Sequence, residues 1–175
     1  MRIIALIGSI YLVGATPVPA QDVRQLPVQV EQIGTAIGGD ANAVVVQDGR
    51  ANDIRLRQSA AGNDATLMQT GDDNSVWALQ DGDAGGVNAL TVAQTGTGNI
   101  ALLEQYAAAG DGNHIALLQN GLNNLADLSQ DGSGNRIVLD QFGDDNRAAI
   151  SQTGSALVLS VTQTGNAVVG IAQTR

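Results

Sequence analysis

The sequence predicts an all-β fold: a two-sheet parallel β-solenoid of about six 22-residue coils, each built as strand-turn-strand. Three observations predict it: a short repeat marked by Gln, Gly and Asn, alternating apolar residues within each repeat, and very few aromatic residues. The 175 residues include 22 Gly and no Cys, and aromatic residues make up 2%. Aromatic side chains usually supply much of a core. Ala, Val, Leu and Ile must therefore fill a thin core between two closely spaced sheets.

Residues 1–20 have the pattern of a secretory signal peptide. Arg2 provides a short positive start, and the apolar stretch 3–13 is too short for an ordinary membrane-spanning helix. Residues 16–20 (Thr-Pro-Val-Pro-Ala) place small side chains before a cleavage point after Ala20. The alternative is an uncleaved anchor. No other segment has the pattern of a membrane span, so no membrane insertion of the remaining chain is expected.

Residues 21–31 precede the repeats and leave two alternatives open. In the first, they form an N-terminal segment outside the solenoid. In the second, Leu26, Val28, Val30 and Gln32 alternate as an extra first strand. Pro27 would suit only an edge of a sheet, because proline cannot donate a ladder hydrogen bond. The repeat region itself is assigned to residues 32–175.

The repeat is defined by a Gln, a Gly two residues after it, and an Asn six residues before the next Gln. Most steps between glutamines are equal to the step from Gln58 to Gln69, and longer steps follow Gln32, Gln80 and Gln105. The glutamines are Gln47, Gln58, Gln69, Gln80, Gln94, Gln105, Gln119, Gln130, Gln141, Gln152, Gln163 and Gln173. The asparagines are Asn52, Asn63, Asn74, Asn88, Asn99, Asn113, Asn124, Asn135 and Asn146. The turn glycines are Gly49, Gly71, Gly82, Gly96, Gly121, Gly132, Gly143, Gly154 and Gly165.

Between each Asn and Gln the apolar residues alternate with outward-facing residues. Ile54 and Leu56, for example, share a face with Asn52 and Gln58. A period of two predicts strands with one buried face, and Gly with Asp or Asn between them predicts tight turns. If successive strands alternate between two sheets, all three longer turns fall on the same edge. That is typical of a solenoid in which one edge accepts insertions.

In such a solenoid each strand stacks on the strand one coil later, in parallel and in register. Identical Asn and Gln side chains then form ladders in which each amide donates to one neighbour and accepts from the other. Buried amides are costly unless they are paired in this way. The open ends of the stack expose unpaired strand edges, and the sequence has no helical or Pro-rich cap. The sequence therefore predicts a chain that polymerises end to end.

The repeat unit resembles the curlin repeat of bacterial curli subunits, most closely in residues 119–130, 130–141 and 141–152. The resemblance implies a functional amyloid: a structural, non-enzymatic subunit of an extracellular, cell-surface fibre for biofilm matrix and adhesion. It also implies export by the general secretory route, passage through a dedicated outer-membrane channel, and a nucleator or major subunit as partner. By the same resemblance, residues 21–26 would be the secretion-targeting segment.

Several half-repeats depart from the pattern. Leu157 stands where Asn is expected, Gln58 is followed by Ser59 and Ala60, and the last half-repeat is one residue short. Asn42 lies five residues before Gln47, where the pattern places Asn six before. These irregular repeats leave open whether the chain is the major subunit or the minor nucleator of the fibre.

Composition and residue types argue against other classes. A net charge of −9 without a basic cluster argues against nucleic acid and anionic membranes as partners. No catalytic set, cofactor motif or metal motif is predicted, because His114 is the one histidine and lies at an outward position without an orienting partner. The acidic turns at 71–74, 110–113 and 143–146 resemble calcium ligands, with plain solvated turns as the alternative.

Two surface features complete the prediction. Five apolar residues at outward positions of one sheet are expected to form a patch: Trp77, Leu79, Ile100, Leu102 and Leu125. This patch is either a tolerated surface or a lateral contact between filaments or with the nucleator. A monomeric ligand-binding or ice-binding solenoid is the alternative function. It would need a regular outward array, whereas the outward threonines are scattered.

Overall fold

The computed structural model describes residues 2–4, 8–13, 29–32, 41–59, 62–83 and 85–175. Within these ranges it contains strands and turns, and it contains no helix that could cross a membrane. The strands are β1 (Arg2–Ile4), β2 (Gly8–Val13), β3 (Gln29–Gln32), β4 (Ala41–Asp48), β5 (Asp53–Ser59), β6 (Asp64–Asp72), β7 (Ser75–Gly82), β8 (Ala89–Thr97), β9 (Ile100–Ala107), β10 (His114–Leu122), β11 (Leu125–Ser133), β12 (Arg136–Phe142), β13 (Arg147–Ser155), β14 (Val158–Thr164) and β15 (Val168–Thr174).

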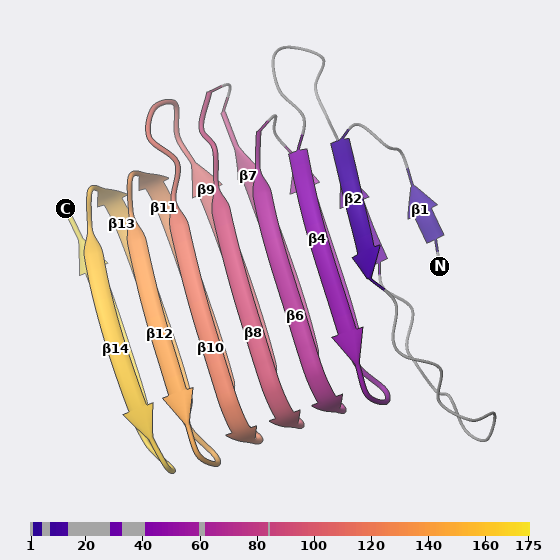
Figure 1. Cartoon of the computed structure of the whole chain (residues 1–175). Coiled ribbons are helices and arrows are strands. Elements are labelled where there is room, and N and C mark those ends of the chain that lie inside the picture. The colour runs from indigo at the N-terminus through magenta and orange to yellow at the C-terminus, as the bar shows by residue number, and fades with distance from the viewer. Residues whose placement is uncertain (1, 5–7, 14–28, 33–40, 60–61, 84) are drawn as a thin grey trace.

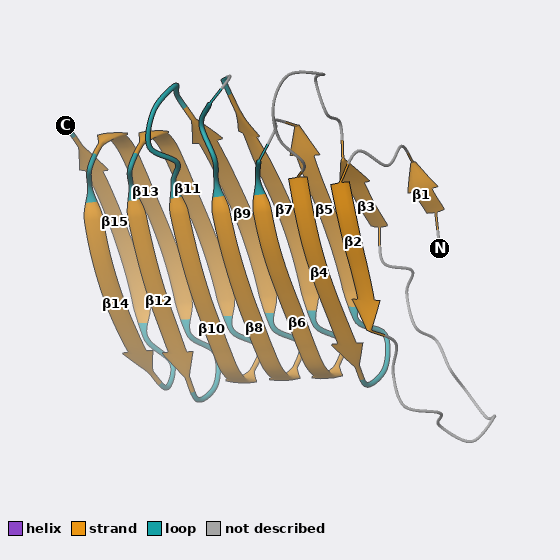
Figure 2. Cartoon of the chain, turned by 45° about the horizontal axis from the view of Figure 1, so that its top comes forward, coloured by secondary structure: helices purple, strands orange, loops and turns teal. Residues whose placement is uncertain are grey.

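The strands form two parallel sheets that face each other along the whole stack (Figures 1 and 2). Sheet A has the order β1-β3-β5-β7-β9-β11-β13-β15, and sheet B has the order β14-β12-β10-β8-β6-β4-β2. Successive strands therefore alternate between the sheets, one coil after another. The predicted two-sheet parallel β-solenoid is confirmed.

The first two strands come from the segment assigned to a signal peptide. β1 pairs with β3, and β2 pairs with β4, so that these strands lie at one end of the stack and β14 and β15 at the other (Figure 1). Cleavage after Ala20 stays a prediction, and Ala20 itself lies outside the described residues. β3 covers Gln29–Gln32 of the expected extra first strand, whereas Leu26 and Val28 lie outside the described residues.

Neighbouring strands are paired in register, with each repeat glutamine beside the next glutamine of its sheet. Gln47 lies beside Gln69 across a regular coil, and Gln69 lies beside Gln94 across a coil with a longer turn. In the shortened last repeat, Gln173 still lies beside Gln152. The insertions and the deletion are therefore absorbed in the turns and leave the register of the sheets unchanged.

The two edges of the solenoid differ. At the regular edge, which joins sheet B to sheet A, the described turns are short and alike. At the irregular edge, which joins sheet A to sheet B, residues 83–88 and 108–113 form longer connections. Both were expected on one edge, and the structure confirms this; the third predicted insertion, after Gln32, lies outside the described residues. The longer loops are visible at the upper edge of Figure 1.

The core is a single layer of alternating apolar side chains between the sheets. Pairs such as Ile54 and Leu56, or Ile137 and Leu139, are fully buried. Burial of one such side chain stabilises a fold by about 1.5–3 kcal/mol, and every coil repeats the contribution. Leu159, Val161 and Ile171 pack against this core but are only partly buried, because they lie in β14 and β15, the terminal strands of the two sheets.

The regular edge brings the backbones of successive coils into direct contact. Gly71 has a φ of +107°, which favours glycine, and a Cβ at Gly71 would collide with the carbonyl oxygen of Gly96. The same relation holds between Gly96 and Gly121. Glycine is required here both by backbone conformation and by the close approach of the next coil.

Candidate functional site: the amide ladders and the ends of the stack

The repeat glutamines form two unbroken ladders, one in each sheet. The Nε2 of each glutamine donates to the Oε1 of the glutamine in the next coil, at distances between 2.7 and 3.1 Å. The second hydrogen of the amide bonds a carbonyl of the opposite sheet, as from Gln80 to Asp64 at 3.0 Å. The glutamines from Gln58 to Gln163 are buried, and these bonds compensate for the loss of water.

The asparagines of sheet A form a third ladder at the regular edge. The Nδ2 of Asn99 donates to the Oδ1 of Asn74 at 3.0 Å, and Asn124 donates to Asn99 at 3.0 Å. The same contacts join Asn74 to Asn52 and Asn146 to Asn124. Each Oδ1 also accepts the backbone N–H of the next rung, as Asn74 does from Asn99 at 3.1 Å.

The asparagines of sheet B, which follow the irregular edge, differ from the expected ladder. Across the described coils, no hydrogen bond between two side chains joins Asn63, Asn88, Asn113 and Asn135 to one another. The Oδ1 of Asn63 accepts the backbone N–H of Asn88 at 2.9 Å, and Asn113 accepts that of Asn135 at 3.1 Å. The buried Oδ1 of Asn88 has no partner among the described residues.

Most of the asparagine amides also hold the turn of the following coil. Asn52 donates to the carbonyl of Gly71 at 2.8 Å, and Asn135 donates to that of Gly154 at 2.9 Å. After the first longer loop, the Nδ2 of Asn88 bonds the carbonyl of Asp81 in β7 at 2.7 Å, whereas after the second the Nδ2 of Asn113 bonds the carbonyls of both Tyr106 at 2.8 Å and Gly132 at 3.1 Å. The contact to the turn of the next coil is therefore absent at Asn88 and kept at Asn113.

The turn glycines have the conformation that their residue type suggests. All of them except Gly82 have a positive φ. The residue that precedes most ladder asparagines is also left-handed, and sequence reasoning missed this position. Its non-glycine members are Ala51, Asp73, Asn123, Asp145, Ala156 before Leu157, and Asn166 before Ala167. The frequent Gly, Asp and Asn at this position were the signal that could have revealed it.

The acidic turns make hydrogen bonds between coils. The Asp72 carboxylate accepts the backbone N–H of Arg50 at 2.9 Å, and that of Asp144 accepts the N–H of Leu122 at 2.9 Å. Among the described residues, no group of three or more His, Cys, Asp and Glu is arranged to hold a metal ion. These two carboxylates therefore act as partners for backbone donors in the preceding coil.

The ends of the stack differ in hydrogen-bonding character. At the C-terminal end, no described residue accepts a hydrogen bond from the Nε2 of Gln173. The Nε2 of Gln163 bonds the carbonyl of Ala167 at 2.9 Å, in place of a further glutamine. At the other end of the described ladder, Gln47 donates to Gln69, and no described residue donates to the Oε1 of Gln47. In both glutamine ladders each amide therefore donates toward the C-terminal end of the stack and accepts from the N-terminal side.

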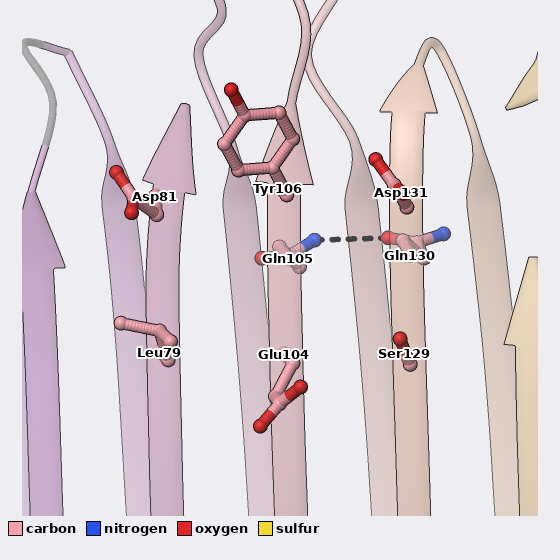
Figure 3. A pocket seen from close by; sticks show the side chains of 8 residues that line it. All are labelled: Leu79, Asp81, Glu104, Gln105, Tyr106, Ser129, Gln130 and Asp131. Atoms are coloured by element: carbon pink, nitrogen blue, oxygen red, sulfur yellow. Dashed lines mark hydrogen bonds between the residues drawn. The ribbon is translucent and has the colours of Figure 1, made fainter. Parts of the chain in front are cut away.

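A hollow of about 340 Å³ lies on sheet A near the irregular edge (Figure 3). Asp81, Tyr106 and Asp131 form one row of it, and Leu79, Glu104 and Ser129 form the next. The Tyr106 hydroxyl donates to Asp83 at 3.1 Å, and this hydrogen bond, with the charge of Asp83, raises the pKa of Tyr106. The lining includes no histidine or basic residue that could form an acid–base pair with these carboxylates.

The apolar residues expected to form one patch on sheet A are divided between rows. Trp77 lies beside Leu102, and Ile100 lies beside Leu125, so these four residues are close together. Leu79 lies two residues after Trp77 on the same face of β7, between Arg57 and Glu104 of the neighbouring strands. Trp77 is 42% exposed. A role of this patch in lateral contact stays a prediction.

His114 begins β10 on the outward side of sheet B, as expected. It is half-buried, and burial together with the charge of Arg136 lowers its pKa. Its Nδ1 is buried without a partner among the described residues. No described carboxylate orients it, so the geometry offers no general base.

A comparison with protein families places these features in a known group. The family described as the curlin associated repeat matches residues 49–82, 121–154 and 132–165. The chain is a curlin-repeat protein. Each match begins and ends at a turn glycine, so the family unit coincides with whole strands and turns of the solenoid. Curlin repeats are typical of curli-type amyloid subunits, which are structural proteins. Comparisons with curated proteins and with solved structures gave no match for this curlin-repeat protein.

Proposed function

We propose that this curlin-repeat protein is the structural subunit of an extracellular curli-like fibre and that it grows by end-to-end stacking of solenoids. The observation that carries the proposal is the open C-terminal end, where β14 and β15 are the terminal strands of their sheets. Val158 and Val168 at this end are 66% and 74% exposed. Unpaired strand edges of this kind are templates for adding another chain.

The residues at the two ends are complementary. If the leader is removed, β3 and β4 become the first strands, and a second copy can add them to β15 and β14. In sheet B, Ala43, Val45 and Gln47 of the second copy would then continue the rows of Leu159, Val161 and Gln163. The partly buried Leu159 and Val161 would become covered, which supplies a hydrophobic gain for each added subunit.

The polarity of the glutamine ladders favours head-to-tail addition. The Nε2 of Gln173, and that of Gln163 once it leaves the carbonyl of Ala167, would meet the Oε1 groups of the incoming copy, so that donors face acceptors. Head-to-head addition would oppose donors to donors, which leaves buried amides unpaired. Every coil of a head-to-tail fibre would repeat the contacts seen inside one chain.

The leader is part of the proposal. Because β1 and β2 pair with β3 and β4, a retained leader would cover the end that the incoming copy must present. Removal of residues 1–20 on export would therefore couple secretion to assembly. Passage through an outer-membrane channel, and partnership with a nucleator or major subunit, are proposed on the strength of the curlin repeat alone.

The test is seeded assembly of residues 21–175 and of residues 1–175, purified from denaturant and followed by thioflavin fluorescence. We expect sigmoidal growth of the shorter chain, a lag shortened by sonicated seeds, a meridional reflection at about 4.7–4.8 Å, and slower growth of the longer chain. A stable, soluble, β-rich monomer of residues 21–175 would overturn the proposal. Trace addition to a related major subunit would separate the two roles, since a nucleator shortens the lag without forming most of the fibre.

A further inference from the structure

The outward face of sheet B has a flat, uncharged central row. From β4 to β14 this row contains small or β-branched residues that are aligned strand by strand: Val44, Thr66, Thr91, Ala116, Val138 and Ser160. None is larger than valine, and none is charged. A second surface can therefore approach this row closely along six strands.

The two rows that flank the central row carry few charges. The row at the strand starts is Asn42, Asp64, Ala89, His114, Arg136 and Val158, and the row on the other side is Val46, Met68, Ala93, Leu118, Asp140 and Thr162. Arg136 and Asp140 lie on the same strand, on either side of Val138. They are about 13 Å apart along β12, too far for an ion pair. Among the described residues the ion pair joins Arg55 to Asp53, and none involves Arg136 or Asp140.

We propose that the outward face of sheet B binds the same face of a second copy around a two-fold axis parallel to the stacking direction. Such an axis reverses the strand direction but keeps each strand opposite its own counterpart. Val138 then faces Val138 of the second copy. Arg136 faces Asp140 of the second copy, and Asp140 faces its Arg136, so that one strand forms two reciprocal ion pairs.

The remaining strands accept the same arrangement. Thr66, Thr91 and Ala116 each meet their own counterparts across the axis. Asp64 falls opposite Met68 of the second copy, and it already accepts a hydrogen bond from the Asn42 amide at 3.0 Å. Six strands about 4.8 Å apart, with three outward residues each, cover on the order of 1,000 Å² in both copies together.

Sheet A does not accept this arrangement. Its central outward row is Arg55, Trp77, Leu102, Asp127, Ala149 and Gly170. The same two-fold axis would place Arg55 opposite Arg55 and Asp127 opposite Asp127. It would also oppose two exposed Trp77 rings, which hold the sheets apart at that coil. Like charges and uneven height therefore favour sheet B as the self-binding face.

This lateral contact does not depend on end-to-end stacking. Two separate solenoids joined by sheet B would form a dimer, whereas two joined fibres would form a doublet. The test can therefore be made on freshly desalted chain and on assembled material. If no lateral contact is found, the proposal of a fibre is unaffected. If the chain forms no fibre, the dimer of separate solenoids can still be measured.

The test uses chemical crosslinking at the proposed axis. The chain has no cysteine, so Val138→Cys introduces a single thiol whose counterpart lies across the axis. Packed sheets lie about 10 Å apart, which a short bismaleimide spans and a disulfide does not. The matched control is Ala149→Cys, in the central outward row of sheet A. We expect crosslinked dimer from Val138→Cys and at least about tenfold less from Ala149→Cys.

Charge reversal provides the decisive comparison. In the Val138→Cys background, Arg136→Asp or Asp140→Arg alone opposes like charges and should lower the dimer yield about tenfold. The double variant R136D/D140R restores both reciprocal pairs and should restore the yield, while Arg147→Asp on sheet A should leave it unchanged. Equal crosslinking at positions 138 and 149, or a double variant no better than the single ones, would overturn the proposal. Circular dichroism of each variant checks that the β-sheet content is retained.

Discussion

The two edges of the solenoid use the same residue types but do not form the same bonds. At the regular edge the asparagines of sheet A bond to one another along the stack. At the irregular edge the asparagines of sheet B bond backbone groups, and one buried oxygen has no partner in the described chain. The glutamine ladders are unbroken at both edges.

The difference shows what a ladder needs. Each glutamine lies within a strand, and the strand continues beyond it, so its position is fixed by the sheet before the chain enters a turn. Each asparagine follows a turn, so its approach depends on turn length. Two longer loops are enough to separate the asparagine amides of sheet B, although the strand register is kept. A regular ladder thus depends on equal turns as well as on equal residues.

The largest effect is expected where backbones touch at the regular edge. Gly71→Ala would place a Cβ against the Gly96 carbonyl at a φ of +107°, and should lower the free energy of unfolding by about 4 kcal/mol. The control is Gly110→Ala in the irregular-edge loop, which has a positive φ but open space around it and should cost about 1 kcal/mol. Urea unfolding of freshly desalted monomer measures both. Equal losses would mean that contact between coils does not explain the glycines.

The next effect separates the two kinds of asparagine. The Asn99 side chain bonds Asn74, Gly121 and Asn124, so Asn99→Ala should cost about 3 kcal/mol. The Asn88 side chain donates to Asp81, and its Oδ1 has no described partner, so Asn88→Ala should cost about 1 kcal/mol. Both changes remove the same atoms from buried sites. A lower urea midpoint for Asn99→Ala than for Asn88→Ala therefore measures the contribution of the ladder hydrogen bonds. Equal midpoints of the two variants would contradict a stabilising role for these bonds.

A smaller, stabilising effect should be the same at both edges. Ala51 at the regular edge and Ala156 at the irregular edge have φ values of 53° and 55°, which strain any residue with a Cβ. Ala51→Gly and Ala156→Gly should each raise the free energy of unfolding by about 0.5 kcal/mol, after the entropy of glycine in the unfolded chain is counted. Thermal unfolding measures this change. A loss of stability in either variant would show that the alanine methyl group packs usefully.

The smallest effect concerns pH at the residue that follows the second long loop. The pKa of His114 is lowered by burial and by Arg136, so the unfolded chain takes up the proton more readily than the folded chain. Stability from this group is present above pH 6.5 and is lost as pH falls below it, until the folded chain is also protonated. We expect this contribution of His114 to the free energy of unfolding to be under about 0.5 kcal/mol, because the side chain is partly solvated. Between pH 8 and pH 5 the native chain should lose slightly more stability than His114→Gln, and an equal loss would contradict the assignment.

Most of the fold followed from the spacing of a few residue types. Gln at the strand end, Gly two residues later and Asn before the next strand indicated strands, turns and sheet membership. The alternation of Ile54 and Leu56 with Arg55 and Arg57 indicated the buried face. These features are local, because a strand of period two and a tight turn each depend on neighbours in the sequence.

Other features depended on which residues meet across coils. The charged cross-strand neighbours of Leu79 follow from its pairing with Arg57 and Glu104 in the adjacent coils. The missing partner of Asn88 follows from the path of a long loop, which spacing alone does not give. The left-handed residues Ala51 and Ala156 were not predicted, because alanine carries no turn signal.

The sequence by itself therefore determined the coil, its core and the positions of the ladder residues, because each depends on a repeated local pattern. Only the tertiary structure decided which amides bond to one another and which end of the stack presents donors. It also decided which outward face can meet a second copy of itself without placing like charges opposite each other. These depend on the registration of residues that lie a whole coil apart in the sequence and on the turns between them. A hydrogen bond requires both partners in place, and a local pattern fixes only one of them.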